Sequence, residues 1–333
     1  MTLAGVPLSV LDLAIVGRDE TPADALASTV TFAQRAEQLG YRRVWYAEHH
    51  NMASIASSAT SVLFAHVAAH TSTIRLGSGG IMLPNHTPLT IAEQFGTLAT
   101  LHPGRIDLGL GRAPGTDQNT MRALRRDERA ADTFPDDVLE LQAYLQGSSR
   151  IPGVEAVPGA GTDVPLYILG SSLFGAQLAA DLGLPYAFAS HFAPAALLDA
   201  VALYRQRFRP SSQLAEPYVM AAINVLAATE TDDAERQLLE VRRRRVARFV
   251  VAPGRELTDD EADRILASPQ GRQLAHMMHY TAAGDPPTVA RRIEDFAAET
   301  GADEVVTVHA SSTGTERLRS LELLAGALAP AGS

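Results

Sequence analysis

The sequence predicts an α/β protein folded as one (β/α)8 TIM barrel. Eight short segments with strand character alternate with eight or more segments of helical periodicity, an order typical of parallel βαβ units. Polar residues follow the predicted strands at the end where such barrels bind their ligands. A length of 333 residues fits one barrel with insertions, so we expect residues 1–333 to form a single domain.

The predicted elements are apolar runs bounded by glycine, proline and polar caps. In the first helix, Thr21 and Pro22 form a helix start and Gly40 ends the helix. The strands are predicted at residues 8–15, 43–47, 74–83, 105–111, 164–169, 186–190, 218–227 and 304–309. The helices are predicted at residues 21–39, 57–70, 87–101, 135–146, 173–182, 194–208, 287–300 and 316–328.

Two segments are longer than a barrel connection requires. A charged, irregular segment at 115–133 follows the fourth strand, and a helical region rich in arginine and acidic residues at about 229–286 follows the seventh. We interpret the second as an insertion that acts as a lid or as a dimer contact. Its basic run, Arg242 to Arg245, is interpreted as a solvated helix face because acidic residues flank it.

Composition excludes several classes of chemistry. The chain contains no cysteine and no lysine, which removes thiol nucleophiles, disulfides, thiolate metal sites, Schiff bases and the Walker lysine. A net charge of -10 without a basic stripe argues against nucleic acid as a partner. Without a signal peptide or an apolar run of about 18 residues, we expect a cytoplasmic protein that does not enter the membrane.

A candidate anion site begins at the fourth strand, where R-I-D-L-G-L-G-R-A-P-G-T-D (105–117) leads into a glycine-rich turn. Gly111 and Gly115 free the backbone, Pro114 prevents a helix there, and Arg112 offers a charged, forked donor. A dinucleotide fingerprint is disfavoured because the third glycine comes one residue late. The alternative is a surface turn with a solvated arginine.

The turn Gly170-Ser171-Ser172 is a second candidate, because the amides and hydroxyls of a helix start attract anions. By itself it is equally consistent with a plain helix cap. We expect Arg112 and the two serines to converge on one phosphate.

Other polar residues also end the predicted strands and should share one rim of the barrel. These are Glu48, His49, His50, Asn85, His86, His191 and His309. Gly79 and Gly80 lie inside a strand, where adjacent glycines indicate a bulge or a flat group pressed against the backbone.

Four motifs in register resemble the bacterial luciferase-like flavin monooxygenases: V-W-Y-A-E-H-H (44–50), L-G-S-G-G-I-M-L-P-N-H-T-P (76–88), R-I-D-L-G-L-G-R (105–112), and L-G-S-S (169–172) followed by A-A-D-L-G-L-P. The resemblance implies a barrel that uses reduced FMN and oxygen, usually as a dimer. It places the FMN phosphate at Arg112, Ser171, Ser172 and Gly175. It also places the flavin ring against Gly79 and Gly80, often through a non-proline cis peptide, and makes His49 the catalytic histidine with Glu48 beside it.

The function expected from this resemblance is that of a flavin-dependent monooxygenase acting on a small organic substrate. We expect His50, His86 and His191 to line the substrate pocket, no metal to take part, and a separate reductase to supply the reduced flavin. Light emission is not implied, because Gly111 stands where some luciferases have a cysteine. Alternatives are a deazaflavin-dependent dehydrogenase, a non-catalytic flavin-binding protein and a metal-dependent barrel hydrolase.

Overall fold

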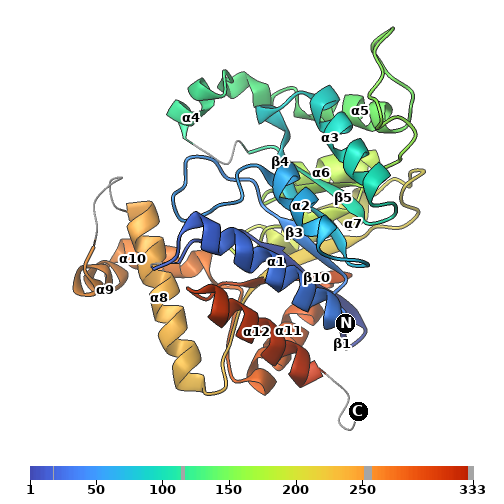
Figure 1. Cartoon of the computed structure of the whole chain (residues 1–333). Coiled ribbons are helices and arrows are strands. Elements are labelled where there is room, and N and C mark those ends of the chain that lie inside the picture. Colours follow the sequence, from blue (N-terminus) through green and yellow to red (C-terminus); the bar gives the residue numbers. More distant parts are fainter. Residues whose placement is uncertain (18, 114–116, 251–256, 329–333) are drawn as a thin grey trace.

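The computed structural model describes residues 1–17, 19–113, 117–250 and 257–328. Eight parallel strands form a closed barrel, because β2 pairs with both β3 and β10 (Figure 1). The barrel strands are β2 (Val6–Asp12), β3 (Arg43–Tyr46), β4 (Arg75–Met82), β5 (Ile106–Gly111), β6 (Leu166–Gly170), β7 (Tyr186–Phe188), β8 (Val219–Ala227) and β10 (Glu304–His309). The predicted TIM barrel is confirmed, and every predicted barrel strand is present.

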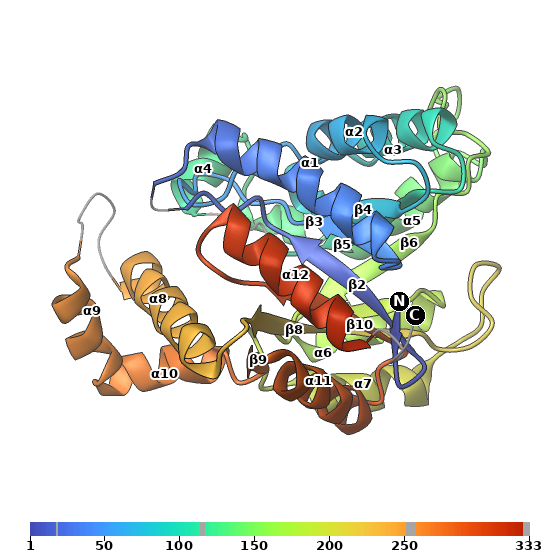
Figure 2. The same cartoon turned by 60° about the horizontal axis from the view of Figure 1, so that its bottom comes forward.

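Helices surround the barrel (Figures 1 and 2). They are α1 (Pro22–Gln38), α2 (Thr60–Ala69), α3 (Pro88–Leu101), α5 (Phe134–Leu145), α6 (Leu173–Leu182), α7 (Leu197–Arg207), α11 (Pro286–Thr300) and α12 (Gly314–Leu328). The start predicted for α1 is confirmed: Thr21 and Asp24 exchange side-chain to backbone hydrogen bonds in a capping box.

Side chains alternate between two cores along the strands. Leu8, Val10 and Val44 belong to the large core packed between strands and helices. The inward side chains fill the barrel with a second apolar cluster, made of Leu11, Trp45, Ala47, Tyr167, Ala187, Met220, Ala222, Val306 and Val308. The barrel is therefore packed, which leaves its carboxyl end for ligands.

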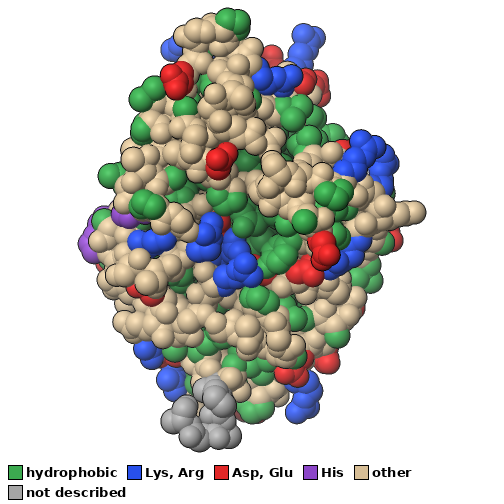
Figure 3. Space-filling model, turned by 90° about the vertical axis from the view of Figure 1, so that its right-hand side faces the viewer, with side chains coloured by type: hydrophobic (Ala, Val, Ile, Leu, Met, Phe, Trp, Pro, Cys, Tyr) green, Lys and Arg blue, Asp and Glu red, His purple; other side chains and the backbone are tan. Residues whose placement is uncertain are grey.

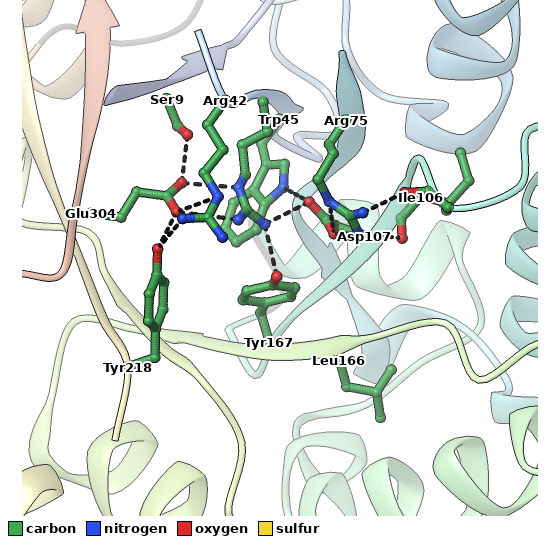
Figure 4. Close-up of polar contacts among 12 residues, drawn as sticks. Ser9, Arg42, Trp45, Arg75, Ile106, Asp107, Leu166, Tyr167, Tyr218 and Glu304 are labelled. Carbon is green, nitrogen blue, oxygen red and sulfur yellow. Dashed lines mark hydrogen bonds and ion pairs between the residues drawn. The ribbon is translucent and has the colours of Figure 1, made fainter. Parts of the chain in front are cut away.

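A charged network closes the amino-terminal end of the barrel (Figure 4). Arg43 Nη1 lies 2.7 Å from Asp107 Oδ2, and Arg43 Nε lies 2.9 Å from Glu304 Oε1. Tyr167 accepts a hydrogen bond from Arg43, and Arg75 pairs with Asp107. Burial alone would lower the pKa of Arg43, but the two carboxylates raise it, so the ion pairs persist.

The two predicted insertions contain more structure than expected. The first holds the short helix α4 (Gln118–Ala123), begun by Asp117 as its N-cap, and a 3-10 turn at Glu128–Ala131. Pro114 and Gly115, which we expected to shape the anion turn, lie outside the described residues.

The second insertion contains α8 (Thr231–Val250), α9 (Asp259–Leu266) and α10 (Pro269–Met277), followed by the unpredicted strand β9 (Thr281–Gly284). β9 pairs in parallel with the last residues of β8. The three helices project from one side of the barrel (Figure 2). β1 (Thr2–Leu3), antiparallel to β2, was not predicted either. Within the described residues, no helix has the length and apolarity needed to cross a membrane.

Candidate active site

The carboxyl ends of the barrel strands, here called the barrel mouth, carry a buried carboxylate held by two histidines. Glu48 follows β3 and is 1% exposed, and its Oε1 atom lies 2.8 Å from His50 Nε2 and 2.9 Å from His86 Nε2. Its other oxygen accepts the Met82 amide at 3.0 Å. Because the carboxylate only accepts, both rings must carry hydrogen on Nε2. We call Glu48, His50 and His86 the Glu48 cluster.

The Glu48 cluster holds a negative charge in place. Burial alone would raise the pKa of Glu48, but the hydrogen bonds from His50 and His86, the charge of His86 and the Met82 amide lower it to about 2. The hydrogen bond to Glu48 raises the pKa of His50 in turn. Glu48 is therefore ionised near neutral pH and fixes the orientation of both rings.

His49 and His191 form a contrasting pair of neutral rings. Burial, then the charge of Arg248, lowers the pKa of His49 to about 4, although Glu48 acts in the opposite direction. Burial, then the charge of Arg245, lowers the pKa of His191 to about 3. The Nδ1 atom of each ring is buried without a hydrogen-bond partner among the described residues. Unpartnered polar atoms of this kind indicate that a ligand group completes the site.

Arg245 and Arg248 were missed by the sequence analysis. The interpretation of the basic run as a solvated helix face holds for Arg243, which pairs with Asp259 and Asp263, but is wrong for Arg245. Arg245 is half-buried, and burial followed by the charge of Arg248 lowers its pKa to about 10. The spacing from Val241, a core residue of α8, to Arg245 and Arg248 was the signal that could have found them, because residues three and four apart share a helix face.

The residues of the predicted anion site follow the neighbouring strands β5 and β6. Gly111 pairs with Leu169, so Arg112 and Ser171 follow neighbouring strands. The Arg112 guanidinium lies 4.0 Å from the ring centre of Phe174, in the first turn of α6. Ser171 and Ser172 are exposed, and Ser172 is the N-cap of α6 although its side chain accepts no hydrogen bond from the amides of the first turn. This leaves hydroxyl groups and first-turn amides open beside a cation.

Two glycine positions keep this side of the barrel narrow. A Cβ on Gly80 would lie 2.6 Å from the Gly109 carbonyl oxygen, and one on Gly175 would lie 3.3 Å from the Tyr186 ring. The peptide bond between Gly79 and Gly80 is cis, in agreement with the resemblance. A side chain at Gly80 would therefore push β4 away from β5.

His309 does not join the other predicted rim residues. Its Nδ1 atom lies 2.8 Å from Ser320 Oγ on α12, and its ring packs edge-on against Phe32 of α1. The expectation that it belongs to the rim is wrong, because strand alternation turns the last residue of β10 toward the helices. Asn85 is buried near the mouth, and its carbonyl accepts a hydrogen bond from Arg126.

The residues at the mouth suit the phosphate and the polar ring edge of a flavin cofactor. Arg112 with the open turn before α6 suits a phosphate, and the unpartnered rings of His49 and His191 suit the polar edge of an organic ligand. Over the described ranges, no group of three or more histidine, aspartate or glutamate side chains is placed to hold a metal ion.

Comparison with known proteins gives consistent matches. A family model described as luciferase-like monooxygenase matches residues 7–304. A protein of Escherichia coli strain K12 named luciferase-like monooxygenase is 46% identical over 329 residues, with 97% of each chain covered. The Bacillus subtilis strain 168 protein named N-acetyl-S-alkylcysteine monooxygenase is 36% identical over 259 residues, with 76% of each chain covered. The crystal structure of apo-MsnO8 is 36% identical, with a TM-score of 0.86 and 98% of each chain covered.

Proposed function

Because this chain belongs to the luciferase-like monooxygenase family, we propose that it oxidises a small organic substrate with molecular oxygen and reduced FMN. The observation that carries the choice of FMN is the contact between Arg112 and the first turn of α6, with exposed hydroxyls beside it. A guanidinium and a helix start together match the charge and the acceptor oxygens of a phosphate.

In this proposal, Arg112, Ser171, Ser172 and the backbone at Gly175 bind the phosphate. Gly79 and Gly80 offer a backbone surface without side chains to the flavin ring. When bound, the flavin supplies the electrons that activate oxygen, a reaction that side chains do not perform by themselves. The protein contributes binding, orientation and the exclusion of water.

His49 is the proposed catalytic residue. A pKa of about 4 keeps its ring neutral near pH 7, and its buried, unpartnered Nδ1 is available to accept a hydrogen bond or a proton from a bound group. Glu48 is a positioning residue in this scheme, because it orients His50 and His86 toward the mouth. We place the substrate beside His50, His86 and His191.

Titration of the purified chain with FMN and with a deazaflavin coenzyme, followed by flavin fluorescence, tests the cofactor. Oxygen uptake is then measured with reduced FMN, a supplied reductase and a panel of aldehydes, ketones, aromatics and N-acetyl-S-alkylcysteines. The panel includes the last group because one relative is named for it. Substrate-dependent oxygen uptake supports the proposal. Deazaflavin binding without oxygen use indicates a dehydrogenase, and FMN binding without turnover indicates a flavin-binding protein.

The proposal also includes a separate reductase, a homodimer and a cytoplasmic location. Light scattering of the purified chain tests for the homodimer, and fractionation of cells that express the chain tests its location. Stimulation of oxygen uptake by an added reductase and NADH tests for the separate reductase.

A further inference from the structure

We propose that Arg245 and Arg248 on α8 bind a carboxylate group of the substrate at the barrel mouth. This rests on the proposed function and narrows it, because it names small organic acids as the substrate class.

The first argument is the position of α8. Val241 packs with Leu226 at the end of β8 and with Met278, while Arg244 donates to the Ser312 carbonyl in the segment after β10. The helix is therefore anchored beside the carboxyl ends of the neighbouring strands β8 and β10. Arg245 follows Val241 by four residues and Arg248 follows by three more, so both lie on the Val241 side of the helix, with Arg245 half-buried and Arg248 exposed.

The second argument is that the two arginines influence residues of the mouth. The charge of Arg248 acts on His49, which follows β3, and the charge of Arg245 acts on His191, which follows β7. In the strand order of the closed barrel, β3 and β7 lie on opposite sides. The two cations therefore act electrostatically on histidines that follow strands on both sides of the mouth.

The third argument is that no acidic residue in the described part of the chain neutralises these two charges. Other arginines of α8 have acidic partners: Arg236 pairs with Asp233 and Glu316, and Arg243 pairs with Asp259 and Asp263. Neither Arg245 nor Arg248 has an ion pair or hydrogen bond within the described part of the chain. Arg245 is half-buried, whereas Arg248 is exposed. A partly buried cation such as Arg245 is costly without an acidic partner, and an anionic ligand removes that cost.

The fourth argument separates this site from the phosphate site. Arg112 follows β5, which lies opposite β10 in the strand order, while α8 is anchored at β8 and beside β10. The carboxylate of Glu48 is already bound by His50 and His86. One cationic site thus remains for the flavin phosphate and a second for an acidic substrate.

The test measures binding to the full chain saturated with FMN. The probes are matched pairs of acid and amide: hexanoate and hexanamide, benzoate and benzamide, N-acetylmethionine and its amide. Ligand-observed NMR and calorimetry are applied to the original chain, to Arg245→Gln and Arg248→Gln, and to the control Arg236→Gln, an ion-paired arginine near the start of the same helix. Arg245→Lys and Arg248→Lys keep the charge and guard against a purely structural loss, and circular dichroism checks folding.

We expect the original chain and Arg236→Gln to bind at least one acid about tenfold to hundredfold more tightly than its amide. The glutamine variants should lose that preference without weakening amide binding, and the lysine variants should retain part of it. A chain that prefers no acid in the panel, or a preference that survives both glutamine substitutions, overturns the proposal.

A separate FMN titration distinguishes the two proposals. Arg245→Gln and Arg248→Gln should leave FMN affinity unchanged. A loss of FMN affinity in these variants would indicate that the two arginines bind the flavin phosphate, and it would overturn the proposed carboxylate site. If the original chain does not bind FMN, the proposed function fails, and the preference for acids is then judged on the flavin-free chain.

Discussion

At the amino-terminal end of the barrel, buried Arg43 contacts both Asp107 and Glu304, whereas at the carboxyl end Arg245 and Arg248 have no acidic partner among the residues that the structure describes. The face of the molecule away from α8 and α9 carries basic side chains on one side of an apolar hollow and acidic side chains on the other (Figure 3). Ion pairs close one end of the barrel permanently. At the carboxyl end, the two arginines without acidic partners and the histidine nitrogens without hydrogen-bond partners in the described ranges are available to a ligand. Arginine thus stabilises the fold at one end of the barrel and is available for binding at the other.

Replacement of His49 with alanine should give the largest effect. We expect turnover to fall about 10²- to 10⁴-fold, because the proposed proton acceptor is lost. Oxygen uptake with a substrate from the panel measures the change, and FMN titration should be nearly unaffected. His66→Ala, on the exposed face of α2, is the matched control. Unchanged turnover in His49→Ala would remove this residue from the mechanism.

Replacement of Arg43 with methionine should break the closed end of the barrel. It leaves Asp107 and Glu304 with less compensation, so the free energy of unfolding should fall by about 3–5 kcal/mol. Urea denaturation measures the loss. The control is Arg35→Met, whose half-exposed pair with Glu322 should contribute less than about 1 kcal/mol. Equal losses in both variants would contradict the importance of burial.

Replacement of Arg112 with alanine tests the phosphate side of the mouth. FMN affinity should weaken about tenfold to hundredfold, because a charged hydrogen-bond donor to the phosphate disappears. Fluorescence titration gives the dissociation constant. Arg122→Ala, an exposed arginine on α4, should bind FMN normally. If both variants bind equally well, the phosphate lies elsewhere.

Acid should weaken the fold through its buried neutral histidines. Burial lowers the pKa of His309 to about 3. Below about pH 6.5, His309 therefore binds a proton in the unfolded chain but stays neutral in the folded chain. The free energy of unfolding should therefore fall with pH between about 6.5 and 3, by up to about 1.4 kcal/mol per pH unit for this group. Glu48, whose pKa is lowered to about 2, adds a loss in the same direction below its ordinary pKa of 4.5.

His309→Asn tests this assignment. Stability measured in urea at pH 7 and pH 5 should depend less steeply on pH in the variant than in the original chain. A parallel pH dependence would mean that His309 does not contribute.

The barrel was predictable because its strands and helices have different periods and clear caps. Thr21 with Asp24 and the apolar run from Ile106 marked their elements without tertiary information. β9 was not predictable in this way, because Thr281–Gly284 contains no apolar run. It forms because β7 has only three residues, which leaves the end of the β8 edge open for pairing.

Some site residues were predictable from the sequence, and others depend on tertiary packing. The Glu48 cluster and the Arg112 turn follow strand ends, so the barrel rule alone placed them at one rim. His309 points toward the helices because side chains alternate between the two faces of β10. The sequence around His309 did not show which of these faces it would take. The position of Arg245 could not be predicted from the basic run, because Arg243 in the same run is ion-paired at the surface. The packing of Val241 and the half-burial of Arg245 together show that Arg245 lies on the packed side of α8.

The pairing of β9 with β8 determines how the excursion of α8, α9 and α10 is joined to the rest of the molecule. The chain leaves the barrel at the end of β8 and returns beside the same strand, so both attachment points share backbone hydrogen bonds. Asn224 reinforces this junction by donating to the carbonyls of His191 and Tyr280. A shortened chain without residues 229–284 would therefore expose a bare strand edge, and self-association of that product is the expected result.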